Sequence, residues 1–244
     1  MIDTVMLDLD GTLLKISQQA FMEVYLNELQ KVFARLGMDV EMSVKALWAG
    51  TKAMVINDGG KLNRVRFWNA FADFTKLDDD KLKVIEAECD RFYENEFNTV
   101  KSVMTEPVNI AERLVRTLTS RGYSVVLATN PLFPACAVTT RLEWLGLLPK
   151  DFLHITHYAN STYCKPNPGY YREILEAVNK NPEQCLMAGN NVNEDMSADA
   201  LGIETFLVTD CLENEACADI TAFRNGSLTE LETYLMSLPD LLFS

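Results

Sequence analysis

The chain contains 244 residues, of which 48% are hydrophobic and 23% are charged. This composition is typical of a soluble globular protein, and the length is sufficient for one large domain or two unequal ones. The formal net charge of −13 and the pI near 4.6 argue against a surface that binds nucleic acid or anionic lipid. Both of those partners require clustered Lys and Arg.

The sequence also indicates the compartment. Residues 1–7 form an apolar run without a basic start or a small-residue cleavage pattern, so we expect no signal peptide. No apolar run approaches the ~20 residues of a membrane-spanning helix, and we expect a cytoplasmic protein with reduced thiols. The six cysteines form no C-x-x-C pair and make a poor zinc site, so each is expected to be a small buried hydrophobe: Cys89, Cys136, Cys164, Cys185, Cys211 and Cys217.

The first predicted strand covers residues 1–7, and the stretch that follows it, residues 16–102, shows helical periodicity without convincing strands. One helix is indicated by an apolar face that starts behind the acidic run 78–80, which favours a helix N-terminus. That face consists of Leu82, Ile85, Cys89, Phe92, Tyr93 and Phe97. We therefore predict a smaller all-helical domain, with Trp48, Trp68 and nearby phenylalanines in its core.

The rest of the chain alternates between predicted strands and helices. Apolar runs at 123–128, 185–188 and 203–208 predict buried parallel strands. A helix is predicted over 107–121, with Pro107 in its first turn and Gly122 at its exit, and another ends near Val178. Such alternation predicts an α/β fold with a doubly wound parallel sheet.

The opening strand ends in Asp8, Leu9, Asp10, Gly11 and Thr12. This position places two carboxylates at the carboxyl edge of the sheet, where open α/β folds bind ligands. Two acids this close repel each other unless they share a cation or a proton. On its own, the run could equally be a surface turn rich in Asp and Gly.

The run resembles the first motif of the haloacid-dehalogenase-like hydrolase superfamily, and three further motifs follow in the family's order. Thr129 and Asn130 directly follow the second predicted strand, and Lys165 precedes the helix that ends near Val178. Residues 189–195 occupy the place of the fourth, acidic motif, with Asp195 as its second acid. Each match alone has a structural alternative, such as a helix cap or a surface charge. Four matches in order favour a shared site.

The resemblance implies a Rossmann-like core over residues 1–15 and 103–244, with residues 16–102 as a helical cap. It also implies that Asp8 attacks phosphorus to form an aspartyl-phosphate and that Asp10 moves protons as a general acid and base. Thr129 and Asn130 would hold the phosphoryl oxygens, and Lys165 would neutralise their charge.

The implied cofactor is Mg²⁺, a hard ion that takes oxygen ligands. Its ligands would be Asp8, the backbone carbonyl of Asp10, and the fourth motif through Asn191 and Asp195. The fourth motif normally supplies two acids, and here the first place is Asn whether it is Asn190 or Asn191. We prefer Asn191 as the altered ligand. Because an amide lacks the charge of a carboxylate, metal affinity should be lower.

The implied function is magnesium-dependent hydrolysis of a small phosphate monoester. Asp10 favours this branch, because the dehalogenases of the superfamily carry an aromatic residue at that place and dispense with the metal. A sugar phosphomutase would use the same aspartyl-phosphate. The alternatives are a catalytically weakened protein that binds a phosphorylated metabolite, which Asn191 would favour, and a dehalogenase-type hydrolase.

A glycine-rich break at residues 57–61 separates two helical stretches of the implied cap. Such a loop can approach a ligand closely, and we predict Lys61 as a substrate contact. Arg64 and Arg66 follow and could add positive charge above the site. An ordinary helix–helix turn with solvent-facing arginines is the alternative.

Overall fold

The computed structural model describes residues 1–104 and 109–242. Its centre is a six-stranded sheet in the order β3-β2-β1-β4-β5-β6, and every pair of neighbouring strands is parallel. The strands are β1 Thr4–Leu7, β2 Ser124–Leu127, β3 His154–Ile155, β4 Cys185–Gly189, β5 Glu204–Val208 and β6 Arg224–Gly226. The predicted doubly wound parallel sheet is confirmed.

The four predicted strands are the four central strands of this sheet. All residues of β1 and β4 are buried, because helices or loops cover both faces, and this is why these strands are continuous apolar runs. The edge strands β3 and β6 were not predicted. They span two and three residues, and β6 consists of polar, mostly exposed residues, so neither produces an apolar run.

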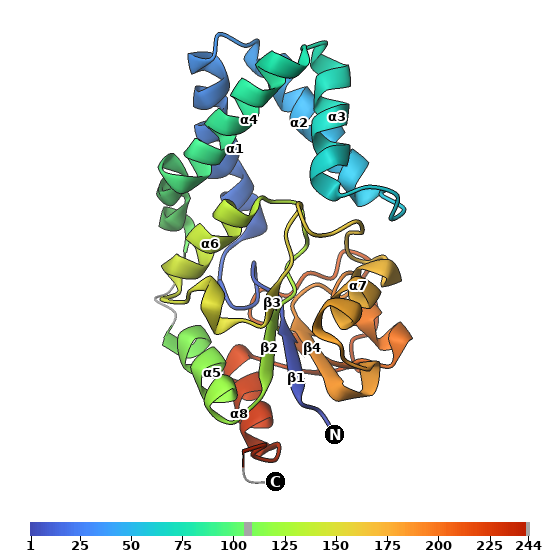
Figure 1. Ribbon diagram of the computed structural model, residues 1–244. Coiled ribbons are helices and arrows are strands. Elements are labelled where there is room, and N and C mark those ends of the chain that lie inside the picture. Colours follow the sequence, from blue (N-terminus) through green and yellow to red (C-terminus); the bar gives the residue numbers. More distant parts are fainter. Residues whose placement is uncertain (105–108, 243–244) are drawn as a thin grey trace.

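Helices cover both faces of the sheet. Figure 1 shows α5 and α8 together on one side of β1 and β2, and α7 on the other side. The helices of this core are α5 Asn109–Ser120, α6 Ala135–Trp144, α7 Pro168–Val178 and α8 Leu228–Ser237, with short 3-10 helices at Pro149–Asp151, Pro182–Gln184 and Met196–Leu201. The predicted helix over 107–121 corresponds to α5, although Pro107 lies outside the described residues. Asn167 caps α7, whose first residue is Pro168.

Residues 16–102 are helical, as predicted, and stand over the carboxyl edge of the sheet (Figure 1). They form α1 Gln18–Arg35, α2 Val40–Val55, α3 Asn63–Thr75, α4 Asp79–Glu94 and a 3-10 helix, Glu96–Val103. Asp78 caps α4 by accepting a hydrogen bond from the Lys81 amide. The two chain segments that join this cap to the core meet in an antiparallel bridge between Ile16 and Met104.

Two expectations about burial were wrong. Trp48 was expected in the cap core together with Trp68, but its exposed fraction is 47% whereas that of Trp68 is 8%. The Trp48 side chain lies against a cavity between the cap and the core. Of the cysteines, Cys217 is exposed, because it lies in the loop after β5, and Cys136 and Cys211 are only half-buried.

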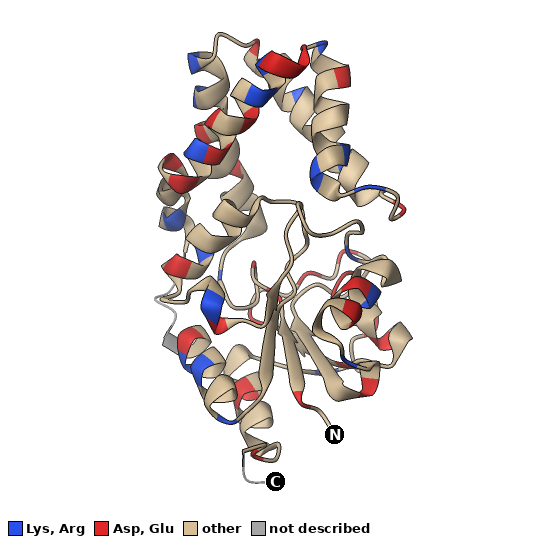
Figure 2. Ribbon diagram, in the orientation of Figure 1, with Lys and Arg blue, Asp and Glu red and all other residues tan. Residues whose placement is uncertain are grey.

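Acidic and basic residues are dispersed along the ribbon. Figure 2 shows acidic and basic residues interspersed along the cap helices, with no continuous basic face in this view. Within residues 1–104 and 109–242, no helix is both long enough and apolar enough to cross a bilayer.

Candidate active site

A cavity of about 150 Å³ lies where β1, β2 and β4 end, under the base of the cap. Six of the residues predicted from the sequence line it: Asp8, Asp10, Thr129, Asn130, Asn191 and Asp195. They meet because β1 lies between β2 and β4, so the loops after these three strands share one edge of the sheet. We call this cavity the acidic site.

Asp8 directly follows β1 and is 7% exposed. Its Oδ1 accepts a hydrogen bond from Lys165 Nζ at 2.9 Å, and its Oδ2 lies 3.1 Å from the Thr12 hydroxyl. Gly11 has a φ of +83°, and a Cβ at this position would lie 2.4 Å from Asn190 Nδ2. Only glycine therefore permits the turn that brings Thr12 back to Asp8.

Lys165 connects the third motif to the first and the fourth. Its side chain is fully buried, and its Nζ lies 2.9 Å from Asp8 Oδ1 and 2.6 Å from Asp195 Oδ1. Burial alone would lower the pKa of Lys165, but Asp195 and Asp8 outweigh it and raise that pKa well above its usual value. Lys165 therefore stays charged and holds the nucleophile candidate in place.

Asp195 is fixed from its other side as well. Its Oδ2 accepts a hydrogen bond from the Asn191 backbone amide at 2.9 Å. Gly189, the last residue of β4, leaves room for it, since a Cβ there would lie 2.1 Å from the Asp195 carboxyl carbon. Burial raises the pKa of Asp195 although Lys165 opposes the shift.

The two asparagines of the fourth motif have different surroundings. Asn191 Oδ1 accepts hydrogen bonds from the backbone amides of Asn193 and Glu194, and its Nδ2 donates to Glu213. Asn190 Oδ1 lies 3.0 Å from the Thr12 hydroxyl, which also contacts Asp8. The asparagine next to the nucleophile loop is thus Asn190, and the role of Asn191 as a metal ligand stays a prediction.

Asp10 is paired with a residue that sequence reasoning missed. Arg141, on α6, is completely buried, and its guanidinium donates to Oδ2 of Asp10 and stacks 4.5 Å from the Phe133 ring. Burial raises the pKa of Asp10, while Arg141 opposes the rise. A signal was present in the sequence, because Arg141 falls on the α6 face that also carries Ala137, Val138 and Leu142.

Two further acids in the cavity were also missed, Glu194 and Glu213. Burial raises the pKa of Glu194 to about 7, and this side chain accepts a hydrogen bond from Asn130 Nδ2 at 3.0 Å. Glu213 comes from the loop after β5, and burial raises its pKa as well. Glu213 has no sequence signal, because it lies in a loop that is placed by backbone pairing with Asn190 and Val192 and not at the end of a predicted strand.

The predicted cap contacts do not reach this cavity. The Lys61 side chain is exposed and lines neither the acidic site nor the cavity beside Trp48. Arg64 pairs with Glu86, and Arg66 pairs with Asp58, so both charges are balanced within the cap. The role of Lys61 in substrate choice stays a prediction.

The family model of the haloacid dehalogenase-like hydrolases matches residues 2–200. The chain belongs to this family. No curated protein matches it.

Solved structures of the same fold cover nearly the whole of this HAD-like hydrolase. They include a 2-haloacid dehalogenase from Pseudomonas syringae pv. Tomato DC3000, with a TM-score of 0.61, 18% identity, and 97% of this chain and 99% of that chain covered. CbbY from Rhodobacter sphaeroides, solved with xylulose-(1,5)bisphosphate, has a TM-score of 0.57 and 18% identity, with 95% of this chain and 96% of that chain covered. YfnB from Bacillus subtilis, bound to magnesium, has a TM-score of 0.56 and 17% identity, with 97% of this chain and 99% of that chain covered. At these identities the similarity shows the fold alone.

The donor set of the acidic site suits a hard cation. The cavity is lined by five carboxyl side chains, and a buried oxygen, Asp10 Oδ1, has no hydrogen-bond partner among the described residues. No three Asp, Glu, His or Cys side chains converge into a complete cage in the part of the chain that is described. Mg²⁺ does not need such a cage, because it typically binds one or two carboxylates, waters and substrate phosphate. The HAD-like hydrolase therefore has a site that fits this ion.

The Asp10–Arg141 pair should be important for stability. Replacing Arg141 with Met leaves the Asp10 carboxylate without its buried partner, and we expect the free energy of unfolding to fall by about 3 kcal/mol in urea titrations. The matched control is Arg116→Met, which breaks an exposed pair with Glu112 on α5 and should cost less than about 1 kcal/mol. Equal losses in the two variants would contradict the assignment.

Glu194 should make stability depend on pH. Its folded pKa of about 7 lies above the ordinary value of 4.5, so its favourable contribution is complete below pH 4.5 and is lost as the pH rises toward 7. In metal-free buffer, Glu194→Gln should flatten the decline in unfolding free energy over this window, which is at most about 1.4 kcal/mol per pH unit. Glu176→Gln, an exposed change on α7, should leave the slope as it is. An unchanged slope in Glu194→Gln would refute this explanation.

Proposed function

We propose that this HAD-like hydrolase cleaves a small phosphate monoester through an aspartyl-phosphate on Asp8, with Mg²⁺ as its cofactor. The observation that carries the proposal is that the buried carboxylate of Asp8 is held by the cation of Lys165 and shares its cavity with a second acid, Asp10. Asp10 lies two residues further along the chain than Asp8.

In the first step, an oxygen of Asp8 forms a bond to phosphorus as the bond from phosphorus to the ester oxygen breaks. Lys165 keeps Asp8 oriented, and its charge offsets the negative charge gathered in the cavity. The leaving oxygen takes a proton from Asp10. The raised pKa of Asp10 suits this role, because an acid that keeps its proton closer to neutral pH can deliver it.

In the second step, Asp10 accepts a proton from water as that water attacks phosphorus. The bond between phosphorus and Asp8 breaks, phosphate leaves, and Asp8 is restored. Arg141 binds Oδ2 of Asp10, and the other oxygen, Oδ1, has no hydrogen-bond partner among the described residues, so Oδ1 is the oxygen proposed to take part in the proton transfers. Arg141 is therefore a positioning residue for Asp10.

Thr129 and Asn130 follow β2 and line the same cavity as Asp8, so they are the groups proposed to hold the phosphoryl oxygens. Two hydroxyl groups, those of Thr156 and Tyr170, donate to the Thr129 carbonyl and fix this turn. Mg²⁺ would be held by Asp8, the Asp10 carbonyl and an amide oxygen of Asn190 or Asn191. When bound, this ion supplies charge neutralisation for the transferred phosphoryl group.

A second candidate is a protein of the same fold that binds a phosphorylated metabolite with little or no turnover. The asparagines of the fourth motif favour it, because neither amide contributes negative charge toward a metal. Assays at high magnesium concentration separate the two candidates. Turnover that rises with magnesium supports the hydrolase, and a flat response supports the binding protein.

The nucleophile is tested by Asp8→Asn. This change keeps the shape of the side chain but removes the attacking carboxylate, so hydrolysis of a panel of phosphate monoesters with magnesium should fall by about 10³-fold or more. Circular dichroism and binding of inorganic phosphate should show that the variant still folds. Retained turnover would disprove the role of Asp8.

The magnesium requirement of two variants shows which asparagine, Asn190 or Asn191, lies closer to the metal. Asn190→Asp places a charge next to the Thr12–Asp8 contact, and Asn191→Asp places one beside Glu213. We expect Asn190→Asp to lower the half-saturating magnesium concentration by about tenfold, and Asn191→Asp to change it less. Magnesium titrations of turnover measure both. A larger effect of Asn191→Asp would support the assignment made from sequence.

A further inference from the structure

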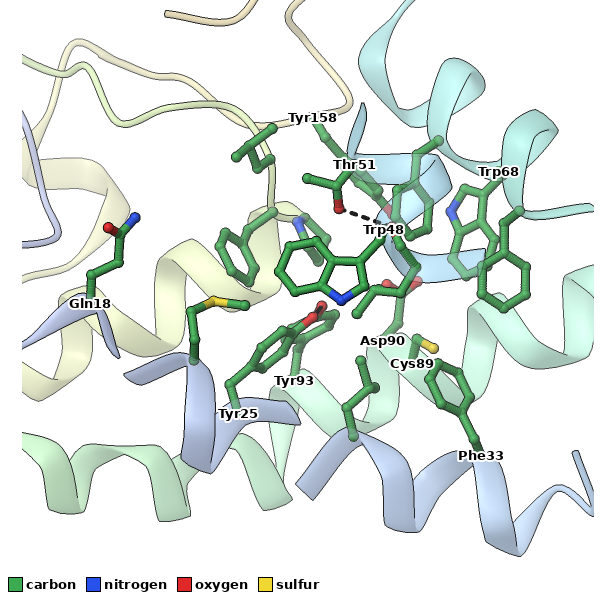
Figure 3. A pocket seen from close by; sticks show the side chains of 18 residues that line it. Gln18, Tyr25, Phe33, Trp48, Thr51, Trp68, Cys89, Asp90, Tyr93 and Tyr158 are labelled. Carbon is green, nitrogen blue, oxygen red and sulfur yellow. Dashed lines mark hydrogen bonds between the residues drawn. The ribbon is translucent and has the colours of Figure 1, made fainter. Parts of the chain in front are cut away.

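A second cavity, of about 220 Å³, lies between the cap helices and the loops of the core. We call it the cap cavity. Figure 3 shows its side chains, with the Trp48 indole reaching into the middle of the view between Tyr25 and Tyr93 on one side and Tyr158 on the other. These residues come from α1, α2, α4 and the loop after β3. The cap and the core therefore build the cavity together.

The cap cavity adjoins the acidic site. Four residues line both spaces, namely Gln18, Met22, Leu132 and Phe133. The Arg141 guanidinium stacks on the Phe133 ring and also binds Asp10. The side chain that lines both spaces is therefore in contact with the partner of Asp10. A molecule whose phosphoryl group lies at Asp8 would extend its remaining part into the cap cavity.

The wall of the cap cavity is mainly aromatic and aliphatic, and it offers few polar groups, the Gln18 amide and the buried Trp68 Nε1 among them. The Tyr25 and Tyr93 hydroxyls bond each other at 2.7 Å, and the Thr51 hydroxyl donates to the Leu47 carbonyl at 3.0 Å. Because most of the wall cannot form hydrogen bonds, a sugar buried here would leave hydroxyl groups without partners, and each unpaired polar group is costly to bury. The wall therefore selects against polyhydroxylated molecules.

The charged residues of the cap cavity also limit which ligands it can bind. None of the described residues that line it is Lys or Arg, whereas Asp90 lines it and is half-buried. The Asp90 carboxylate accepts a long hydrogen bond from the Cys136 thiol, at 4.0 Å. A second anionic group on a ligand would face this carboxylate without a cation to balance it. Bisphosphates and molecules with a carboxylate in this part are therefore disfavoured.

We infer that the substrate is a phosphate monoester of a compact apolar alcohol, whose uncharged hydrocarbon part occupies the cap cavity. This inference rests on the proposed function and narrows its substrate class. A cavity of roughly 150 Å³ lined by aliphatic and aromatic side chains accepts benzene, so the cap cavity accommodates about one or two rings. Trp48 is half-exposed because its side chain lines this cavity and is not packed in the core of the cap.

Turnover tests the inference with esters that all release an aliphatic alcohol, so that leaving-group chemistry is comparable. We expect naphthylmethyl phosphate to have a kcat/KM at least about tenfold above those of glycerol phosphate and glucose phosphate. Trp48→Ala should remove most of that preference. The matched control is Phe74→Ala, which removes another exposed aromatic side chain of the cap, 41% exposed on α3 and outside the cap cavity. It should leave the ranking unchanged.

Binding without turnover separates this inference from the proposed function. Naphthylmethanol should bind the metal-free wild-type chain, as followed by its fluorescence. Trp48→Ala and the cavity-filling variant Thr51→Phe should weaken that binding by about tenfold, and Phe74→Ala should not. If no ester is hydrolysed but this binding pattern holds, the proposed function fails and the cavity assignment stands. If glucose phosphate is preferred and naphthylmethanol does not bind, the inference is overturned while the hydrolase survives.

Asp90 provides an independent check on charge. A naphthylmethyl phosphate that carries a carboxylate on its ring should be a poor substrate for the wild type. Asp90→Asn should raise its kcat/KM about tenfold while changing that of the unsubstituted ester by less. An equal response of the two esters would overturn the role of charge in this cavity.

Discussion

The buried ammonium group of Lys165 is the interaction on which the rest of the site depends. It contacts Asp8 at 2.9 Å and Asp195 at 2.6 Å, and its side chain has no exposed area. A buried charge that loses its partners is strongly unfavourable, so the three groups stabilise one another only as a set. The surrounding backbone makes room for this set, since Gly189 leaves space for Asp195 and Gly11 leaves space for Asn190. The nucleophile candidate is therefore placed by the fold before any substrate arrives.

Much of this arrangement could be predicted because it follows from the order of strands. Apolar runs predict central strands, and polar residues that follow parallel strands meet at one edge, which is why Asp8, Thr129 and Asp195 line one cavity. Arg141 was missed because it reaches Asp10 from the interior of a helix, 131 residues along the chain, where no strand end marks it. Glu213 was missed because its position depends on the conformation of a loop. Trp48 was misassigned because an apolar residue that lines a cavity has the same periodicity as a core residue.

The acidic site and the cap cavity divide recognition between them. In the acidic site, five carboxyl side chains line one cavity, and burial raises the pKa of one of them, Glu194, to about 7. The cap cavity offers apolar surface and one half-buried acid, Asp90. Phe133 belongs to both walls and supports the Arg141 guanidinium, so the packing of the cap and the orientation of Asp10 are physically connected.

The central claim is that the reaction takes place at phosphorus and not at carbon, and the position of oxygen-18 after turnover in labelled water tests this most directly. Water that hydrolyses an aspartyl-phosphate attacks phosphorus, so the account predicts that the label enters the released phosphate and that the peptide containing Asp8 stays unlabelled in mass spectra. Attack of Asp8 on carbon would instead give a carboxylic ester, whose hydrolysis at the carbonyl carbon puts the label into Asp8. Label in the Asp8 carboxylate would contradict the account.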